Sequence, residues 1–485
     1  MIQKLGAAFV KYKALYDAAI LRLLPEKLSE QISVTDFGAK GDGVTDDTPA
    51  FRAAIKAAYR AGGMGAGVYV PPKDTPYIVT DLIITSAIRL YSDGKYGATL
   101  KTHNGSTLIP RAAFTVIEGL NFVGGGKDSN NTMAIRIEGP LITVRDNSFA
   151  FYDACVFCEK GKSSAELTIQ NNRFAASNYA VFSGGGQINS HFFNNTYSDC
   201  YTAIHASEDV SAGVSSVTEG LMFTNELVYS CGNSAKNRKA IEIIGTRWTW
   251  FNSCMSDLAG GQALYLEDAK DVKIDFGYYS SNHSGSEACI EVVGACDNLR
   301  INGTCISDSR YFGLYVTKRG ANAPKNMRLT NVTFQFNDID SAQQGDLLID
   351  SVEGITATDC DFLGTRTNNV MLISNMGNSS LHLRGCSHVV GVTLTTPQCK
   401  LTSVDSPTHP DLQEGVAIIP DGLTFVDVGL RTKALAAATI VAIASIDGTA
   451  AEPVSTKINP EGTLRISRVG TSGNRAVAYR VKLVY

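Results

Sequence analysis

The chain has 485 residues, of which 44% are hydrophobic and 19% are charged, and its formal net charge at pH 7 is −4. The hydrophobic fraction is that of a globular protein, so the composition excludes wholesale disorder. Charge that is this sparse and nearly balanced excludes a broad basic surface for phosphate recognition, and we expect no nucleic-acid partner. A chain of this length normally forms two to four domains, unless a repeat extends one of them.

The first 24 residues predict an amphipathic helix. Apolar residues recur at helical spacing, but five charged side chains interrupt them, so the segment is too polar to cross a bilayer. It also lacks the pattern of a secretory signal. We expect this helix to pack on its own domain or on its copies in an oligomer, without membrane insertion.

The 11 cysteines do not have the spacing of a disulfide framework. Cys155 and Cys158 form a lone CxxC, with no second pair and no histidine at zinc spacing. We therefore predict buried free thiols, folding in a reducing cytoplasm, and neither a metal nor a cofactor.

A short phrase repeats from about Leu120 onward. In each copy a strand-like run ends in a polar corner, often with Asn, and an apolar residue follows two positions later. We place the copies at residues 120, 147, 172, 195, 225, 252, 277, 303, 332, 360 and 385. Short strands at such a period, with Gly, Asn, Asp and Ser corners, predict one coil of a parallel β-helix per copy.

A second strand in each coil alternates apolar inward positions with outward ones. The outward positions form a column, which from N to C consists of Phe157, Phe182, His205, Glu242, Tyr265, Glu291, Tyr315, Leu348 and Met371. A solvated face would be rich in Lys, Thr and Ser, whereas this column alternates aromatic rings with carboxylates. A long groove of this kind suits a polysaccharide, because sugars stack on rings and glycosidic cleavage needs a proton donor and a base.

Three carboxylates are the candidate catalytic groups. Glu242 and Glu291 lie two coils apart, about 9.6 Å between backbones. Their long side chains can bring the carboxylates into the range of about 6.5–9.5 Å that inverting glycosidases use. Glu267 lies one coil from Glu242, on a diagonal of about 8 Å. The alternative is that all three are solvated carboxylates on the outer face of strands.

The candidate substrate-binding residues are aromatic or basic. They are His205, Tyr265, Tyr315, Trp248, Trp250 and Arg247. Tyr265 would serve as a sugar platform or would desolvate a neighbouring acid. The two tryptophans alternate on one strand, so they form either an outward stacking platform or part of the interior.

The segment before the repeat reads ISVTDFGAKGDGVTDDTPAF at Ile32–Phe51, and GVYVPP follows at Gly67–Pro72. It resembles the opening segment of pectate-lyase-like β-helix proteins, particularly bacteriophage tailspikes and capsule depolymerases. With the coils, the resemblance covers about residues 32–400. It implies an all-β fold, a right-handed parallel β-helix of about eleven or more coils, and a homotrimer.

The resemblance also implies a place on the virion. The protein would be made in the host cytoplasm, join phage tail or baseplate proteins, and act at the bacterial cell surface. Residues 1–31 would then be a helical attachment segment.

A helix is expected over residues 48–61, with Thr48 as N-cap and Pro49 in its first turn. It would cover the open end of the coil, where an edge would otherwise be exposed. After Cys399 the period is lost, and residues 401–485 predict short strands and a small β-sandwich. Its role would be trimerisation or carbohydrate binding.

We therefore expect a phage tailspike that binds and cleaves a bacterial capsule, exopolysaccharide or O-antigen. Hydrolysis by paired carboxylates is favoured over β-elimination because the column holds more acids than cations. A lyase would need a base such as His205 or Tyr265 and a cation from Arg247, Lys239 or Arg310. A non-catalytic receptor-binding spike is the third alternative, since the fold alone does not choose among these activities.

Overall fold

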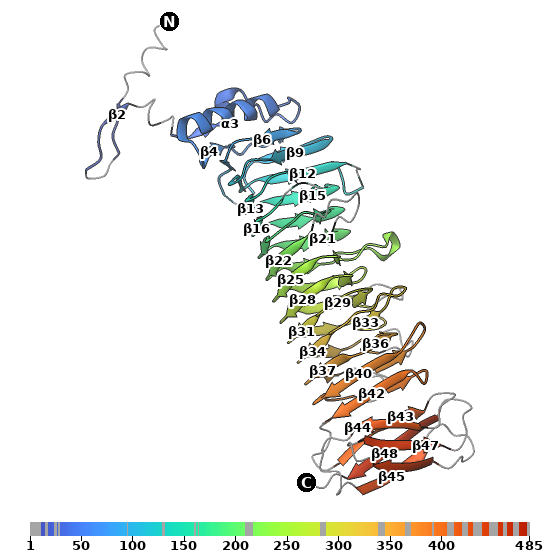
Figure 1. The fold of residues 1–485 in the computed structure, drawn as a ribbon. Helices are drawn as coiled ribbons and strands as arrows, with labels where there is room; N and C mark the ends of the chain where they lie inside the picture. Colours follow the sequence, from blue (N-terminus) through green and yellow to red (C-terminus); the bar gives the residue numbers. More distant parts are fainter. Residues whose placement is uncertain are drawn as a thin grey trace.

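The computed structural model describes most of the chain from residue 30 onward. The described residues are 11–14, 18–23, 27, 30–94, 96–128, 131–159, 162, 164–208, 217–281, 288–337, 345–363, 370–389, 392–404, 412–419, 425–429, 439–445, 454–458, 463–468 and 475–482. Within them, the chain winds into a stack of coils, and equivalent strands of successive coils form three long parallel sheets (Figure 1). The predicted all-β, right-handed parallel β-helix of about eleven coils is confirmed.

We number the three sheets in the order in which the chain visits them within a coil. Sheet 1 has 15 strands: β3 (Ile32–Ser33), β4 (Ala66–Tyr69), β7 (Ile88–Tyr91), β10 (Val116–Glu118), β13 (Thr143–Arg145), β16 (Thr168–Gln170), β19 (His191–Phe193), β22 (Glu219–Thr224), β25 (Arg247–Asn252), β28 (Lys270–Asp275), β31 (Arg300–Asn302), β34 (Arg328–Thr330), β37 (Ile355–Thr358), β40 (Ser379–Arg384) and β42 (Cys399–Val404). Sheet 2 has 12 strands: β5 (Tyr77–Ile78), β8 (Thr99–Lys101), β11 (Asn121–Val123), β14 (Ser148–Ala150), β17 (Arg173–Ala175), β20 (Thr196–Ser198), β23 (Leu227–Tyr229), β26 (Met255–Ala259), β29 (Tyr278–Ser281), β32 (Cys305–Ser307), β35 (Thr333–Gln335) and β38 (Asp361–Phe362). Sheet 3 has 13 strands: β6 (Leu82–Ile84), β9 (Gly105–Pro110), β12 (Thr132–Ile137), β15 (Ala154–Cys158), β18 (Tyr179–Ser183), β21 (Thr202–Ser207), β24 (Ile241–Ile244), β27 (Leu264–Glu267), β30 (Ile290–Val293), β33 (Leu314–Thr317), β36 (Leu347–Asp350), β39 (Val370–Ile373) and β41 (Val392–Leu394).

The corner between sheets 1 and 2 explains the repeated Asn. One residue per coil is left-handed there, such as Asn171 with φ 55°, a conformation that Asn tolerates better than most residues. The next position holds a buried amide ladder, in which the side chain of Asn147 donates to Asn172 at 3.2 Å and that of Asn172 donates to Asn195 at 3.1 Å. These bonds satisfy buried polar groups and lock the coils in register.

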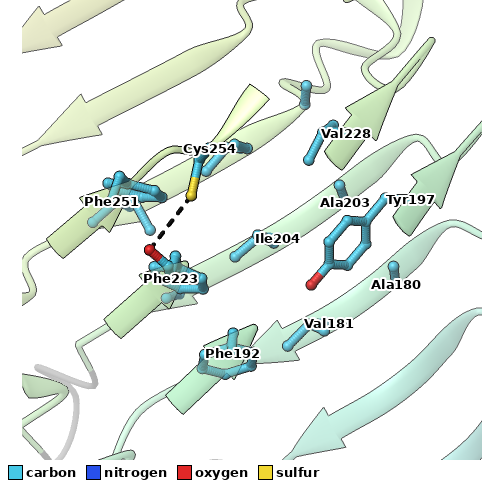
Figure 2. Close-up of a cluster of buried hydrophobic side chains, with 14 of the residues drawn as sticks. Ala180, Val181, Phe192, Tyr197, Ala203, Ile204, Phe223, Val228, Phe251 and Cys254 are labelled. Carbon is cyan, nitrogen blue, oxygen red and sulfur yellow. Dashed lines mark hydrogen bonds between the residues drawn. The ribbon is translucent and has the colours of Figure 1, made fainter. Parts of the chain in front are cut away.

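Inside the coil, like side chains stack on like. The rings of Phe122, Phe149, Phe174 and Tyr197 follow one another with centroids 4.8, 4.9 and 5.1 Å apart. Figure 2 shows the next part of the core, where Tyr197 and Val228 from sheet 2 lie among apolar side chains of sheets 1 and 3. The predicted interior position two residues after the corner is therefore correct for the first coils.

The predicted register is wrong in the middle coils. Thr196 pairs with Leu227, so Val228 lies opposite Tyr197 and is buried, whereas Leu227, expected inside, is 39% exposed. In the next coil Ser256 pairs with Val228, and Cys254, which is buried as expected, lies two residues before that aligned position. The corner has the same length in both coils, but Asn225 takes the left-handed position of Asn194 rather than the ladder position of Asn195, so aligning copies by their Asn letters is one residue out.

Helix α3 (Thr48–Gly62) covers the first coil as expected, and Phe51 packs edge-on against Tyr77 at 5.6 Å. Its N-cap is Asp47 rather than Thr48. The Thr48 hydroxyl instead accepts a hydrogen bond from the Thr80 N–H at 2.9 Å, which ties the helix to the coil. A short 3-10 helix, η2 (Val34–Phe37), precedes α3 and contacts it.

The predicted N-terminal helix is not present in the described part of residues 1–24. Strands β1 (Lys11–Tyr12) and β2 (Arg22–Leu23) pair antiparallel instead, and Ala18 has φ 65°. Ile20, one of the apolar residues of the predicted helix, is 74% exposed, so it lacks the burial on which an amphipathic helix depends. Residues 1–10 lie outside the described residues.

All 11 cysteines are free, and all but Cys305 are buried, as predicted.

Beyond the coil the chain forms two three-stranded antiparallel sheets. One contains β43 (Leu412–Ile419), β48 (Arg475–Lys482) and β45 (Thr439–Ser445); the other contains β44 (Phe425–Gly429), β47 (Thr463–Arg468) and β46 (Val454–Ile458).

The amide ladder ends on a buried carboxyl group, which makes stability depend on pH. Glu226 accepts hydrogen bonds from the Asn195 amide at 3.1 Å and from the Tyr197 hydroxyl at 2.5 Å. Burial nevertheless raises the pKa of Glu226 to about 7. Because the folded protein holds this proton more tightly than the unfolded chain, the stabilisation is complete below about pH 4.5 and declines as the pH rises to about 7.

We predict that Glu226→Gln removes this loss, which amounts to about 3 kcal/mol at most. The amide replaces the protonated carboxyl group, so the variant should be more stable than the wild type at pH 8 and similar to it at pH 5. Thermal unfolding at both pH values measures the difference. The half-exposed Glu219→Gln is the control, and equal pH dependence in Glu226→Gln and the wild type would contradict the prediction.

Candidate functional site

The predicted outward column lies on sheet 3, and each member pairs directly with the next. The pairs run Phe157–Phe182–His205–Glu242–Tyr265–Glu291–Tyr315–Leu348–Met371, in unbroken parallel register. Neighbouring members are therefore about 4.8 Å apart along the coil axis. Glu242 and Glu291 lie two coils apart with Tyr265 between them, as the sequence predicts.

Stacked rings form the N-terminal part of the column. Phe157 stacks on Phe182 at 5.2 Å, and Phe182 stacks on the His205 imidazole at 4.7 Å. Nδ1 of His205 lies 2.8 Å from Oε2 of Glu242. The side chain of Glu242 is largely buried although it lies on the outer face of sheet 3. The stack on one side and the carboxylate on the other hold the imidazole in one orientation.

Tyr265 and Glu267 form the next contact along the column. The Tyr265 hydroxyl donates to Oε2 of Glu267 at 2.6 Å, and the guanidinium of Arg319 bridges Glu267 and Asp268. Burial raises the pKa of Tyr265, and the hydrogen bond to Glu267 and the charges of Glu267 and Glu291 raise it further. Tyr265 is therefore a neutral donor at neutral pH rather than a base.

Glu291 and Tyr315 form the C-terminal part. Oε2 of Glu291 accepts a hydrogen bond from the Gln262 side chain at 2.7 Å. Burial raises the pKa of Tyr315, and the charges of Asp350 and Glu291 add to the shift. Tyr315 and Met371 pack on a small cluster around Phe312 and Leu348, so this end of the column is apolar.

One wall of the column comes from the loop before β24, which contains the short helix η3 (Ser234–Lys236). This loop lies on Gly260 and Gly261, where any side chain would collide with the backbone of Gly232 and Arg238. The close approach places Nζ of Lys239 5.1 Å from the centre of the Tyr265 ring. A cation therefore lies beside the acids.

The tryptophans do not belong to this column. Arg247, Trp248 and Trp250 lie on β25 of sheet 1, a different face of the coil from sheet 3, and all three side chains are exposed. Of the two alternatives that the sequence left open for Trp248 and Trp250, the structure shows the outward one. However, the structure does not bring them together with the candidate carboxylates.

Sequence reasoning missed Gln262 and Arg319, which hold Glu291 and Glu267. Both lie in corner segments outside the strands, where no periodic pattern indicates what a side chain will contact. Within the described residues, no group of His, Cys, Asp and Glu side chains is arranged to hold a metal ion. No helix in the described part is long and apolar enough to cross a membrane.

Comparison with known proteins agrees with this architecture. Residues 31–261 match the family model of rhamnogalacturonase A/epimerase, pectate lyase-like proteins. A tail spike protein of an Escherichia phage is 50% identical over 66 residues, which are 14% of this chain and 8% of that protein. Alginate lyase 7 of Azotobacter vinelandii is 61% identical over 41 residues, 8% of this chain and 5% of the lyase.

The A-module of mannuronan C-5 epimerase AlgE6 from Azotobacter vinelandii shares the fold. Its TM-score is 0.52 at 17% sequence identity, over 78% of this chain and all of that chain. The resemblance to pectate-lyase-like β-helix proteins and tailspikes is thus confirmed. The matched segments span less than a tenth of the curated relatives named here, so the similarity is local.

The ion pairs of Arg319 with Glu267 and Asp268 attach the loop after β33 to the end of β27. We expect Arg319→Ala to raise amide hydrogen exchange in the 319–322 turn about three- to tenfold, because two ion pairs to the strand end are lost. Exchange measured by mass spectrometry tests this expectation. Arg328→Ala, an exposed arginine on sheet 1, is the control, and unchanged exchange in Arg319→Ala would show that the turn holds itself.

Proposed function

We propose that this pectate-lyase-like β-helix protein binds and cleaves a bacterial surface polysaccharide by hydrolysis along sheet 3. The unbroken column of rings and carboxylates is the observation that carries the proposal. A linear glycan lying across several coils would meet platforms and acids at the spacing of the coils. The named relatives, a tail spike protein and an alginate lyase, fit a polysaccharide ligand.

The proposed chemistry uses Glu242 and Glu291 on either side of Tyr265. One carboxyl group protonates the leaving glycosidic oxygen, and the other takes a proton from the attacking water. The backbone separation of about 9.6 Å leaves room for a sugar ring and that water. Glu267 completes the acidic site and, through its hydrogen bond, orients the Tyr265 hydroxyl.

The high pKa of Tyr265 favours hydrolysis over an elimination that uses this phenol as the base. A lyase is the second candidate because Lys239 lies over the Tyr265 ring. In that case Lys239 would neutralise the carboxylate of an acidic sugar, and His205, held by Glu242, would remove the proton.

The proposed setting is the tail of a phage virion, with the protein as a homotrimer and residues 1–31 as its attachment segment. The local similarity to a tail spike protein supports this assignment. Residues 401–485 would then serve trimerisation or carbohydrate binding, the two roles that small antiparallel sheets behind a β-helix suit.

Glu242→Gln and Glu291→Gln should each reduce cleavage at least about a hundredfold while the glycan still binds, because each removes one half of the acid–base pair. The assay incubates the protein with a panel of bacterial capsular and exopolysaccharides and counts new reducing ends. Absorbance from unsaturated sugars is followed in parallel. The exposed Glu353→Gln should retain full activity.

Three outcomes would contradict the proposal. Unsaturated products would establish the lyase instead. Binding without chain shortening would leave an adhesive spike. Full activity in both glutamine variants would place the chemistry elsewhere on the molecule.

Phe157→Ala should raise KM about tenfold with little change in kcat, since the ring would bind substrate three coils away from Glu242, the nearer of the two carboxylates. Steady-state kinetics on the cleaved polysaccharide give both constants. Phe193→Ala, an outward ring on sheet 1, is the matched control. A fall in kcat with an unchanged KM would exclude a platform role for Phe157.

A further inference from the structure

A second outward column, on sheet 1, carries a row of adjacent cations. Trp250, Lys273, Arg300 and Arg328 pair directly from β25 to β34, and all four side chains are exposed. The row spans about 14 Å, with one positive charge about every 4.8 Å over its last three members. Like charges directly opposite on neighbouring strands destabilise a sheet, so this arrangement calls for a negatively charged partner.

More cations lie beside this row. Arg247 pairs with Lys270 in the adjacent strand, and Lys325 follows two coils later; all three are exposed. None of the six cations forms an ion pair within the part of the chain that the structure describes.

The acids of the same face are used differently. The carboxylates of Asp271, Asp275 and Asp297 accept hydrogen bonds from side-chain amides of the following coil, at 2.6, 3.3 and 2.8 Å. They brace the coils against one another. Asp297 lies in register between Lys270 and Lys325, but none of the three carboxylates forms an ion pair with a cation of this face within the described residues.

Two large aromatic rings lie at the N-terminal end of the row. Trp248 is 50% exposed and Trp250 is 40% exposed, and Nζ of Lys273 lies 5.1 Å from the centre of a Trp250 ring. They are the only tryptophans in the chain. An exposed indole beside a cation offers a flat surface for a sugar ring and a charge for an acidic group on the same sugar.

We propose that the outer face of sheet 1 from β25 to β34 binds an acidic polysaccharide chain, separately from the site on sheet 3. The cations pair with the carboxylates of successive sugars, and the tryptophans stack on sugar faces. The proposed function supplies only the kind of polymer, because binding here requires no cleavage. A thin single glycan chain also fits a protein of net charge −4, since it contacts only the strip and avoids the acidic surroundings.

The tryptophans report directly on this face. Titration with sodium alginate, polygalacturonate or hyaluronate, with excitation where tyrosine does not absorb, should shift or quench the indole emission for at least one polymer. Neutral dextran should leave it unchanged. The affinity should fall as salt is added, because exposed ion pairs are screened.

A triple variant tests the cations. Lys273→Gln, Arg300→Gln and Arg328→Gln together should weaken binding about tenfold or more. The control triple, Arg52→Gln, Lys56→Gln and Arg60→Gln on the exposed face of α3, changes the net charge equally and should bind like the wild type. The sheet 1 triple should melt no lower than the wild type, since it relieves repulsion, and circular dichroism verifies its fold.

The outcomes separate this inference from the proposed cleavage. Glu242→Gln and Glu291→Gln should bind the acidic polymer with unchanged affinity at this face. Unchanged indole emission with all three polymers, or equal affinity in the two triples, would overturn the inference and leave the cleavage proposal intact. An equal or tighter response to a single-stranded oligonucleotide would overturn it too, and so would emission that depends on protein concentration alone, which indicates a second copy on this face.

Discussion

The whole molecule depends on the parallel hydrogen-bond ladder that joins each coil to the next. This ladder repeats about every 4.8 Å and allows no change of face, so each side chain meets the equivalent side chain of the neighbouring coil. The side chain at each position must therefore pack or bond favourably with the side chain at the equivalent position of the next coil. Phe122, Phe149, Phe174 and Tyr197 satisfy this condition inside the coil by stacking their rings.

The same constraint turns single residue choices into long surfaces. Amides bond to amides along Asn147, Asn172 and Asn195, because Asn carries both a donor and an acceptor. The ladder ends at Glu226, and burial raises the pKa of this carboxyl group because it removes water from the charged form, although the hydrogen bonds from Tyr197 and Asn195 oppose the shift. On the outer faces the ladder lines up rings and acids on sheet 3 and cations on sheet 1, two strips of opposite chemistry on one solenoid.

The loops between strands are not bound by this coil-to-coil register, so they can place side chains of a different charge beside a column. Lys239 and Arg319 bring cations to the acidic column, and Gln262 holds Glu291. A column of identical charged residues would be destabilised by repulsion between neighbouring coils. A column of identical neutral residues would have the same chemistry along its whole length. Side chains from loops and corners of differing length therefore distinguish one part of the column from the rest.

The amino-acid pattern was sufficient to predict the repeat, the inward and outward faces of sheet 3 and the order His205–Glu242–Tyr265–Glu291, because alternation along a strand is a local property. It also indicated the capping helix and the buried thiols. Three features became known only from the folded chain: Val228 rather than Leu227 faces the core, Trp248 and Trp250 lie away from the candidate carboxylates, and the described residues 11–14 and 18–23 form a pair of strands rather than a helix. Each of these depends on pairing or packing between segments that are distant in sequence. The amino-acid pattern does not show which Asn of a corner is left-handed, which face of the coil a strand joins, or what covers an apolar stripe.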